Sequence, residues 1–444
     1  MQGAGRDGQG LPVLAAGAAG ALWRWRVELA LLALPAIAWR LLARPLGELA
    51  AGAVVAWAVA GVLASPGASG ALSRWLRARH VRRRFRRAWI DAGLAPLLLG
   101  RLRTVPAGES APVRVSSGCS VAELEARREQ LAASIGLREL RVERDPADAS
   151  RGTVTLVRRD PLAAGTVAWP CAGAERLSLW EPVPVGVDEL GEAVSLGLVE
   201  RNVLLGGEPG AGKSVALSLL VATAALDASA RLWLLDGKLV ELSAWAPCAR
   251  RLAGPDVDDA IDLLRSLRSE MEARYRELLA RGARKITPGD GLALHLLACD
   301  ELAFYLTAED RKKQREFAEL LRDLVARGRA AGVIVCAATQ KPAADVVPSA
   351  LRDLFGFRLA LRCNTPQSSD TILGQGWASA GYSAACIAPG QRGVGYLLAE
   401  DGLPVRMRGF HLRDEQIAAL AGRASALRAD AWLATENGDD REKR

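Results

Sequence analysis

The stretch Asn202-Val-Leu-Leu-Gly-Gly-Glu-Pro-Gly-Ala-Gly-Lys-Ser214 determines the fold that we expect for this chain. Within it, Gly207-x-x-x-x-Gly212-Lys213-Ser214 matches the pattern of a phosphate-binding loop, or P-loop. An apolar strand is expected at 203–205, before the loop, and an apolar helix at 215–225, after it, which is the context that a P-loop requires. The alternative is a glycine-rich turn without a ligand, and the flanking elements argue against it.

Each residue type in this loop has a physical role in nucleotide binding. Glycines allow backbone N–H groups and a helix N-terminus to converge on a phosphate group. Lys213 adds positive charge toward the β- and γ-phosphates, and the hydroxyl of Ser214 can ligate Mg²⁺. We therefore expect ATP and Mg²⁺ as ligands. The expected nucleotide-binding residues are Gly207, Glu208, Pro209, Gly210, Ala211, Gly212, Lys213, Ser214 and Val215.

The positive charge of the 444-residue chain is concentrated near its N-terminus. Residues 1–100 contain 13 Arg and 4 acidic residues, a net charge of +9. The remaining 344 residues carry 45 Lys and Arg against 46 Asp and Glu, a net charge of −1. The basic balance is therefore a property of the N-terminal region and does not indicate that the nucleotide-binding part binds nucleic acid.

The cysteines indicate a reducing compartment. They lie far apart, form no CxxC pair and are odd in number, a pattern that favours free thiols over a disulfide framework or a zinc site. The seven are Cys119, Cys171, Cys248, Cys299, Cys336, Cys363 and Cys386.

Residues 11–64 are largely apolar and predict a membrane anchor. Two helical spans, around 29–39 and 49–65, would be joined by a tight turn at Pro45-Leu-Gly47 to form a transmembrane hairpin. Charged residues such as Glu28, Arg40 and Glu48 interrupt the apolar region around these runs, so a buried helical pair in a soluble protein is the alternative. A signal-peptide core at 11–23 is disfavoured, because no convincing cleavage site follows it.

An arginine-rich segment follows the expected hairpin. Eight of the 14 residues from Arg74 to Arg87 are arginine. Placed after two spans, this segment fits the positive flank that remains in the cytoplasm, and we expect a bacterial cytoplasmic-membrane protein with its motor domain in the cytoplasm. A nucleic-acid-binding arm is the competing interpretation, since arginine runs also neutralise phosphates.

The rest of the chain predicts an α/β fold. Apolar strands alternate with helices from residue 199 onward, which indicates a parallel sheet with helices on both faces. The expected domains are the membrane anchor and arginine-rich segment (1–90), a small α+β module (91–185), an ATPase motor domain (186–412) and a C-terminal helix with a charged tail (413–444).

Further candidate site residues follow three expected strands. Asp300 and Glu301 end an apolar strand, where Asp300 can hold Mg²⁺ through water and Glu301 can polarise the attacking water. Gln340 ends the next strand and can sense the γ-phosphate. Asp236-Gly-Lys238 ends another and is either an exposed turn or a structural element near the nucleotide. Ligands of such sheets bind at the carboxyl ends of the strands, so we expect these residues to converge.

These motifs occur in the order and approximate spacing of the FtsK/SpoIIIE family. The resemblance is strong over 186–412 and loose over 91–185. The segment Gly374-Gln-Gly-Trp-Ala-Ser-Ala-Gly-Tyr-Ser383 most resembles the conjugative plasmid-transfer (Tra) proteins of actinobacterial integrative elements. The other matching segments are Gly207–Ser214, Asp236–Leu242, Asp300-Glu301, Gly328–Gly332, Ala338–Pro342 and Asp370–Gln375.

This resemblance implies a RecA-like motor that assembles as a homohexameric ring around double-stranded DNA and pulls it by ATP hydrolysis. It places Lys213 and Ser214 on phosphate and Mg²⁺, Asp300 on the metal, and Glu301 and Gln340 in catalysis. It implies that Arg329 is an arginine finger, which reaches the nucleotide of a neighbouring subunit. The alternative for Arg329 is a cation at a helix C-terminus, which the helix dipole favours.

The chain departs from the family pattern at two points. Where the family has an arginine before Thr-Ile-Leu, this chain has Asp370, so the role of that arginine does not transfer. About 30 residues follow Leu412, too few for the winged-helix module that selects DNA in chromosomal translocases. Selection of DNA would then depend on a partner, such as accessory transfer proteins. The leading hypothesis is conjugative DNA transfer, and the alternatives are a type VII-like protein-export ATPase and a chromosome-segregation translocase.

Overall fold

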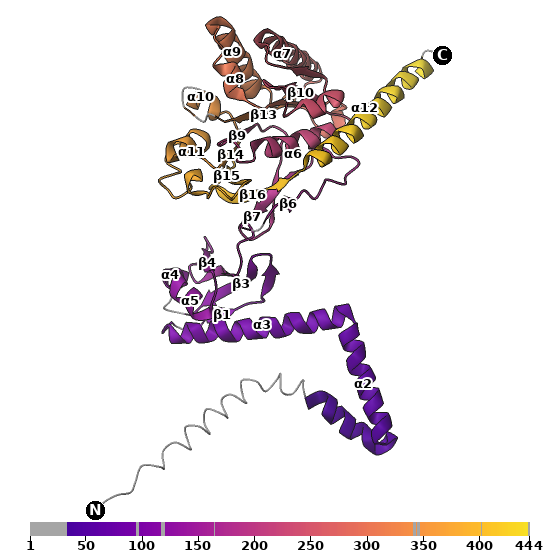
Figure 1. The fold of residues 1–444 in the computed structure, drawn as a ribbon, viewed down its shortest axis with the longest axis vertical. Helices are drawn as coiled ribbons and strands as arrows, with labels where there is room; N and C mark the ends of the chain where they lie inside the picture. Colours follow the sequence, from indigo (N-terminus) through magenta and orange to yellow (C-terminus); the bar gives the residue numbers. More distant parts are fainter. Residues whose placement is uncertain are drawn as a thin grey trace, which may run out of the picture.

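The computed structural model describes residues 33–94, 97–116, 120–163, 165–340, 343, 347–400 and 402–442. It contains a large α/β domain, a small α+β module and a pair of long N-terminal helices (Figure 1). The part of the first expected span before residue 33 lies outside the described residues.

Six parallel strands form one half of the large sheet. Their order across the sheet is β11-β10-β12-β13-β9-β14, so the strand that leads into the P-loop lies between two later strands. Most are short apolar runs buried on both faces, as a helix-covered parallel sheet requires. Their bounds are β9 (Val203–Gly206), β10 (Arg231–Leu235), β11 (Arg251–Ala253), β12 (His295–Cys299), β13 (Val333–Thr339) and β14 (Phe357–Leu361).

The other half of the sheet is antiparallel, which corrects the expectation of a purely parallel sheet. It continues from β14 through β15, β16, β7 and β8, and β6 adds to β16. These strands include glycines and half-exposed positions, so they carry no long apolar run that marks a strand in the sequence. Their bounds are β6 (Val167–Ala168), β7 (Val183–Asp188), β8 (Ala193–Leu196), β15 (Val394–Leu398) and β16 (Val405–His411). The domain boundary expected at residue 186 therefore falls inside β7.

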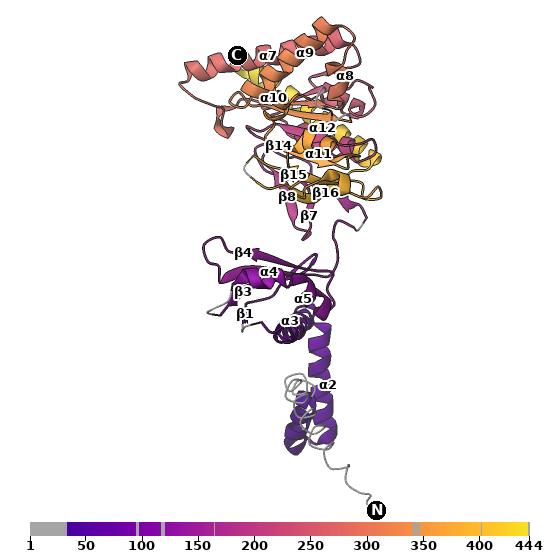
Figure 2. The same ribbon diagram turned by 90° about the vertical axis from the view of Figure 1, so that its left-hand side faces the viewer.

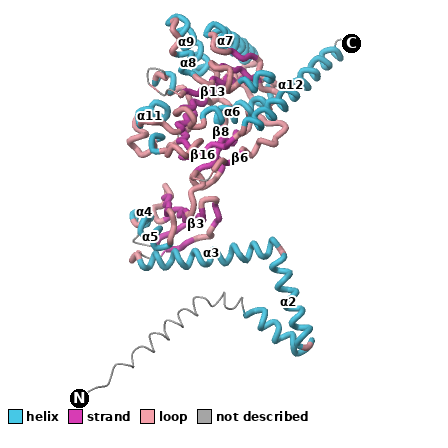
Figure 3. The backbone as a smooth tube through the Cα atoms, viewed as in Figure 1, coloured by secondary structure: helices cyan, strands magenta, loops and turns pink. Residues whose placement is uncertain are grey.

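Helices cover both faces of this sheet (Figures 1 and 3). One face packs against α6 (Lys213–Ala225), the 3₁₀ helix η1 (Ser243–Cys248) and α12 (Asp414–Glu442). The opposite face packs against α7 (Val257–Ala280), α8 (Leu302–Leu306) and α9 (Arg311–Arg327). The shorter helices are α10 (Ser349–Arg352), α11 (Pro366–Leu373), η2 (Pro288–Asp290) and η3 (Ala384–Cys386).

The C-terminal helix belongs to the motor domain. Leu420 and Ala424 on α12 are fully buried in the core that α6 shares. Arg428 donates to the backbone carbonyls of Ala230 and Ala224, both at 2.9 Å, and thereby satisfies the last turn of α6. The helix expected from residue 415 is thus present, and its first half is a structural part of the ATPase fold.

The small module is a sheet of five antiparallel strands with helices on one side (Figure 2). Its order is β1-β3-β5-β4, and β2 pairs with β3. Its strands and its helices α4 and α5 agree with the expected α+β module. The bounds are β1 (Leu97–Leu99), β2 (Arg103–Val105), β3 (Gly108–Val115), β4 (Glu139–Arg144), β5 (Arg151–Val157), α4 (Val121–Ala126) and α5 (Arg128–Ile135).

The arginine-rich segment lies on α3 (Pro66–Asp91), and its second half packs on the small module. Val81, Phe85, Ala88 and Trp89 are buried against α5 and the module's sheet, and their spacing places them on one face of the helix. The expected boundary near residue 90 therefore lies at the end of a helix that contributes to the module's core.

The N-terminal helices meet at sharp breaks. Residues 33–46 are helical, the backbone turns at Gly47, and α2 (Glu48–Ala64) follows. The indole N–H of Trp39 donates to the carbonyl of Glu48 at 3.0 Å, which holds the two helices together at the turn. Among the described residues, no single helix is long and apolar enough to cross a membrane. Residues 48–61 and α3 are joined at a bend of 80°. Taken together, this pair is long and apolar enough to cross a membrane, by length and composition alone.

Candidate nucleotide-binding site

The P-loop connects the end of β9 to the start of α6. Three of its glycines have positive φ, at 152° for Gly207, 73° for Gly210 and 111° for Gly212. A side chain at any of these positions would strain the backbone. The loop therefore curls over the N-terminus of α6, where unpaired N–H groups and the helix dipole favour an anion such as a phosphate.

The side chain of Lys213 spans the loop. Its ammonium group donates to the carbonyl oxygens of Gly207 at 2.7 Å and Glu208 at 2.8 Å, and the residue is buried. Burial lowers the pKa of Lys213, whereas the carboxylates of Glu301, Asp300 and Glu208 oppose that shift. A cation held in this position is available to a phosphate group in the loop.

The antiparallel half of the sheet supports the P-loop through backbone contacts. The N–H of Gly393 donates to the carbonyl of Ala211 at 2.9 Å, and the N–H of Gly409 donates to the carbonyl of Gly393 at 2.8 Å. A Cβ atom on Gly212 would lie 3.2 Å from the Cα of Gly393. The loop thus packs tightly against Gly393, the residue before β15, and Gly409 on β16 supports Gly393 in turn. The sequence analysis missed this support because it did not recognise β15 and β16.

Asp300 stands at the end of β12 in a strongly negative environment. Its carboxyl group is buried, and burial raises its pKa to about 7, with further contributions from Glu241, Asp236 and Glu301. A cation close to this carboxyl would stabilise its ionised form.

The donor set fits Mg²⁺ in the manner of nucleotide-dependent enzymes. Among the described residues, no group of three or more His, Cys, Asp and Glu side chains could hold a metal ion. Mg²⁺ commonly takes one or two protein ligands and completes its octahedral shell with water and substrate phosphates. Asp300 and the Ser214 hydroxyl would be those two ligands, and the ion would stabilise charge on the phosphates when bound.

Glu301, next to Asp300 after β12, is held by the end of the neighbouring strand, β13. Its Oε1 accepts from the hydroxyl of Thr339 at 3.1 Å, and both carboxylate oxygens accept from the N–H of Gln340 at 3.1 Å. The same carboxylate caps α8 by accepting from the N–H of Ala303 at 3.4 Å. The carboxylate that we expect to polarise water is therefore held by β13, and Thr339 is a positioning residue that the sequence analysis did not assign.

A cavity of about 740 Å³ opens beside these groups. It lies over the N-terminus of α6 and extends to β16. Seven of the expected site residues line this one space, namely Pro209, Gly210, Gly212, Lys213, Ser214, Val215 and Gln340. The cavity is also lined by Gly165, Thr166, Arg392, Phe410 and His411, which the sequence analysis did not predict.

Asp236 has a structural role. The residue is fully buried, and its carboxylate accepts from the N–H of Lys238 at 3.1 Å and from the N–H of Leu242 at 2.8 Å. These bonds order the turn that follows β10. Asp236-Gly-Lys238 was expected to be either an exposed turn or a structural element near the nucleotide. The burial and hydrogen bonds of Asp236 agree with the structural element.

Arg329 lies apart from the other expected site residues. It follows α9 and precedes β13, so it stands at the edge of the sheet where the parallel strands begin. The P-loop follows the end of β9, at the opposite edge. The side chain of Arg329 is 41% exposed and donates to Glu400 at 2.7 Å. It cannot serve the nucleotide site of its own subunit from this position.

The fold and this site define a P-loop ATPase with a mixed sheet. The model of the FtsK/SpoIIIE family matches residues 178–412, more than half of the chain, and the chain belongs to that family. The resemblance found in the sequence and the expectation of an ATPase are therefore confirmed.

Two curated relatives show the extent of the sequence similarity. The DNA translocase FtsK of Pseudomonas aeruginosa is 27% identical over 273 residues, which cover 53% of this chain and 32% of the relative. The DNA translocase FtsK of Vibrio parahaemolyticus is 28% identical over 230 residues, which cover 44% of this chain and 22% of the relative. The chain thus spans about a third or less of the length of these relatives.

A solved structure is similar over most of the chain. It is that of the pCW3 conjugation coupling protein TcpA, a monomer form with ATPgS. The two chains are 18% identical with a TM-score of 0.53, and the match covers 79% of this chain and 99% of that chain. At this identity the likeness concerns the fold.

Proposed function

We propose that this protein is an ATP-driven translocase of double-stranded DNA. The convergence of Lys213, Asp300 and Glu301 at one edge of the sheet carries the proposal, because it provides the groups that ATP hydrolysis requires. Family membership connects this ATPase to DNA, since the curated relatives above are named DNA translocases.

The residues would act as follows. Residues 207–215, Lys213 among them, bind and orient the phosphates of ATP. Ser214 and Asp300 hold Mg²⁺, which neutralises charge on the phosphates. Glu301, held by Thr339 and Gln340, orients the attacking water and accepts its proton. The Gln340 side chain, which lines the cavity, senses the γ-phosphate.

The active assembly is a homohexameric ring. Arg329 stands at the sheet edge opposite its own P-loop, so it could complete a site only on another subunit. A ring places that edge of each subunit against the nucleotide site of the next. The developing charge on the phosphoryl group is then stabilised by the arginine of the neighbour.

The cellular role is conjugative DNA transfer at the bacterial cytoplasmic membrane, with the motor domain in the cytoplasm. The likeness in fold to a conjugation coupling protein supports this role over chromosome segregation. The apolar N-terminal region and the arginine-rich helix α3 support membrane anchoring. Accessory transfer proteins would then select the DNA.

The test is ATP hydrolysis by the full chain in detergent, with and without long duplex DNA. We expect turnover that rises with duplex DNA and is lost in Lys213→Ala. Turnover that ignores DNA and responds to a secreted polypeptide would overturn the proposal in favour of a protein-export ATPase.

A further inference from the structure

The structure contains a groove lined by arginines that the nucleotide site does not use. It lies between α9 and α10 and has a volume of about 370 Å³. Arg311, Arg315 and Arg322 line one wall, on one face of α9, because they are separated by four and seven residues. Among the described residues that line this groove, none is acidic. The other lining residues are Leu306, Gln314, Ala318, Pro348, Ala350 and Leu351.

The charge of the three guanidinium groups is not balanced by ion pairs within the described residues. All three side chains are exposed, and no carboxylate in the described part of the chain lies within ion-pair distance of them. Other exposed arginines of the domain, such as Arg265, Arg268 and Arg327, have such a partner. Three exposed cations without counter-ions form a surface that attracts a polyanion.

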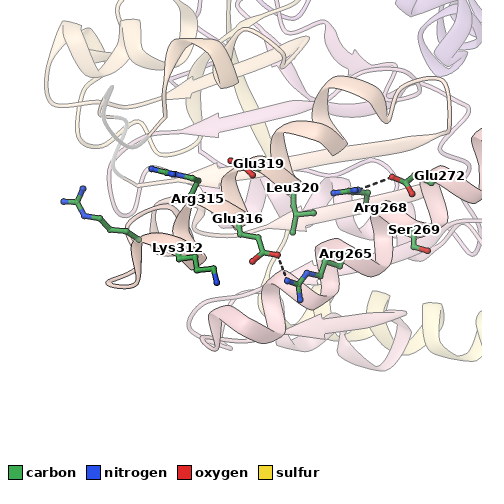
Figure 4. A pocket seen from close by; sticks show the side chains of 10 residues that line it. Arg265, Arg268, Ser269, Glu272, Lys312, Arg315, Glu316, Glu319 and Leu320 are labelled. Atoms are coloured by element: carbon green, nitrogen blue, oxygen red, sulfur yellow. Dashed lines mark hydrogen bonds and ion pairs between the residues drawn. The ribbon is translucent and has the colours of Figure 1, made fainter.

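The adjacent face of α9 provides a direct contrast (Figure 4). There, α7 and α9 line a hollow that Arg311 and Arg315 also border, and in which Arg265 and Arg268 are neutralised by acidic residues. Arg265 is paired with Glu316 and with Asp262, and Arg268 with Glu272 at 3.2 Å. Figure 4 shows Arg315 pointing away from the Arg265–Glu316 pair. Arg311 and Arg315 therefore stand between the paired residues of the hollow and the groove, and Arg322 lines only the groove.

We propose that this groove, defined by Arg311, Arg315 and Arg322, binds the phosphate backbone of duplex DNA during translocation. The inference rests on the proposed function. Arg311 and Arg322 are 11 residues apart, which is about 16 Å along a helix with a rise of 1.5 Å per residue. That distance matches roughly five steps of 3.4 Å along one DNA strand. Contacts to phosphates carry no sequence information, which suits a motor that moves along any duplex.

The groove is connected to the nucleotide site by α8. Glu301 caps the first residue of this helix, and Leu306, its last residue, lines the groove. Pro348 lines the opposite wall and follows Gln340 by a few residues in the chain. The backbone N–H of Gln340 donates to the carboxylate of Glu301. A phosphate bound in the groove would therefore lie beside the end of α8, the helix whose N-terminus Glu301 caps.

The test compares Arg315→Ala/Arg322→Ala with the wild type in duplex-stimulated ATP hydrolysis and in duplex binding at several salt concentrations. We expect unchanged basal turnover and a rise on the order of tenfold in the DNA concentration that gives half-maximal stimulation. The slope of log K against log salt should fall by about 2, because each lost phosphate contact removes roughly 0.9. Alanine keeps the helix propensity of α9, so the variant should remain folded.

Two variants make the result specific. Arg268→Ala removes an arginine from the neutralised hollow and should leave the salt slope unchanged. Arg315→Lys/Arg322→Lys keeps the charge and should restore most of the affinity. If the wild type is stimulated by DNA and the alanine variant keeps the same slope, the groove proposal is overturned while the proposed function stands. If the wild type neither binds nor responds to duplex DNA, the proposed function fails, and the groove proposal fails with it.

Discussion

Arg329 donates a hydrogen bond to Glu400 over 2.7 Å, at the edge of the sheet opposite the P-loop. Arg201 reaches the other carboxylate oxygen of Glu400 at 3.5 Å. The carboxylate thus holds two partly exposed arginines at one edge of the subunit. In a ring, this edge is the one that would face the nucleotide of the next subunit.

This arrangement predicts that two inactive variants complement each other. Arg329→Ala should lower ATP turnover of the assembled protein by about 10³-fold, the lower range for loss of an arginine finger. Glu301→Gln should also be inactive. In a mixed ring, an Arg329→Ala subunit keeps its own Glu301 and can receive Arg329 from a Glu301→Gln neighbour, so mixing should restore turnover.

The control for complementation is a mixture in which both changes are on the same chain. Arg329→Ala/Glu301→Gln mixed with Glu301→Gln contains no subunit with an intact Glu301 and should stay inactive. If the two single variants also remain inactive when mixed, although they co-assemble, Arg329 does not act on a neighbour.

Glu301→Gln should separate nucleotide binding from hydrolysis. The amide keeps the size of the side chain but cannot accept a proton from water, so we expect kcat to fall by at least about 100-fold. Binding of ATP should change little, because Lys213 and the P-loop are intact. Lys213→Ala should instead lose binding. Filter binding of labelled ATP beside steady-state turnover distinguishes the two variants, and a Glu301→Gln protein with normal turnover would exclude this residue as the base.

Asn202 predicts a stability effect at the start of β9. Its side chain is 1% exposed, donates to the carbonyl of Val325 at 2.9 Å and accepts from the N–H of Val335 at 2.8 Å. Asn202→Ala leaves both backbone groups buried without these partners, which should cost about 2 to 4 kcal/mol. Asn202→Asp keeps the acceptor for Val335 and removes the donor. Urea unfolding measures both variants, and a cost below about 1 kcal/mol for alanine would contradict the expectation.

His295 predicts a loss of stability in acid. The ring accepts from the indole N–H of Trp233 at 3.0 Å, and burial lowers its pKa to about 3, with contributions from Arg274, Arg231 and Arg250. Between pH 6.5 and 3 the unfolded chain takes up a proton that the folded protein excludes, so stability falls as the pH falls through this range. From pH 6.5 to pH 5 the loss should be roughly 2 kcal/mol.

The measurement is the difference in Tm between pH 7 and pH 5. His295→Gln keeps an acceptor for Trp233 and cannot be protonated, so its Tm should depend less on pH than that of the wild type. An equal pH dependence in both proteins would show that His295 does not cause the acid sensitivity.

The sequence predicted those strands whose residues are mostly apolar because both faces of the strand are buried. Strands β10 and β14 agree with the expected alternation of apolar strands and helices after residue 199, because each is a short apolar run with helices on both sides. The pairing of β15 with β16 could not be predicted, because Gly395 and Arg408 interrupt their apolar patterns. Arg408 is tolerated in a buried position because it donates to the carbonyl of Leu162, a contact distant in sequence.

The candidate site was predicted unevenly for similar reasons. The P-loop, Asp300 and Glu301 are local motifs, and the strand order brings them together without further information. The hydrogen bond from Thr339 to Glu301 joins two residues that are 38 positions apart in the chain. It forms only because β12 and β13 are paired in the sheet, and the sequence does not show this pairing. The roles of the predicted site residues themselves stay predictions until the variants above are measured.

The contact between Gly212 and Gly393 has a consequence for how this protein can diverge. Both residues have positive φ, and a Cβ atom on Gly212 would lie 3.2 Å from the backbone of Gly393, closer than most side-chain contacts. Most positions of β15 and β16 can drift as long as the core is filled, but the backbone at Gly393 limits which residue can stand at position 212, although the two are far apart in the chain. Homologues that lose one should lose ATP binding, so this pair offers a marker for telling active ATPases from degenerate copies in genome surveys.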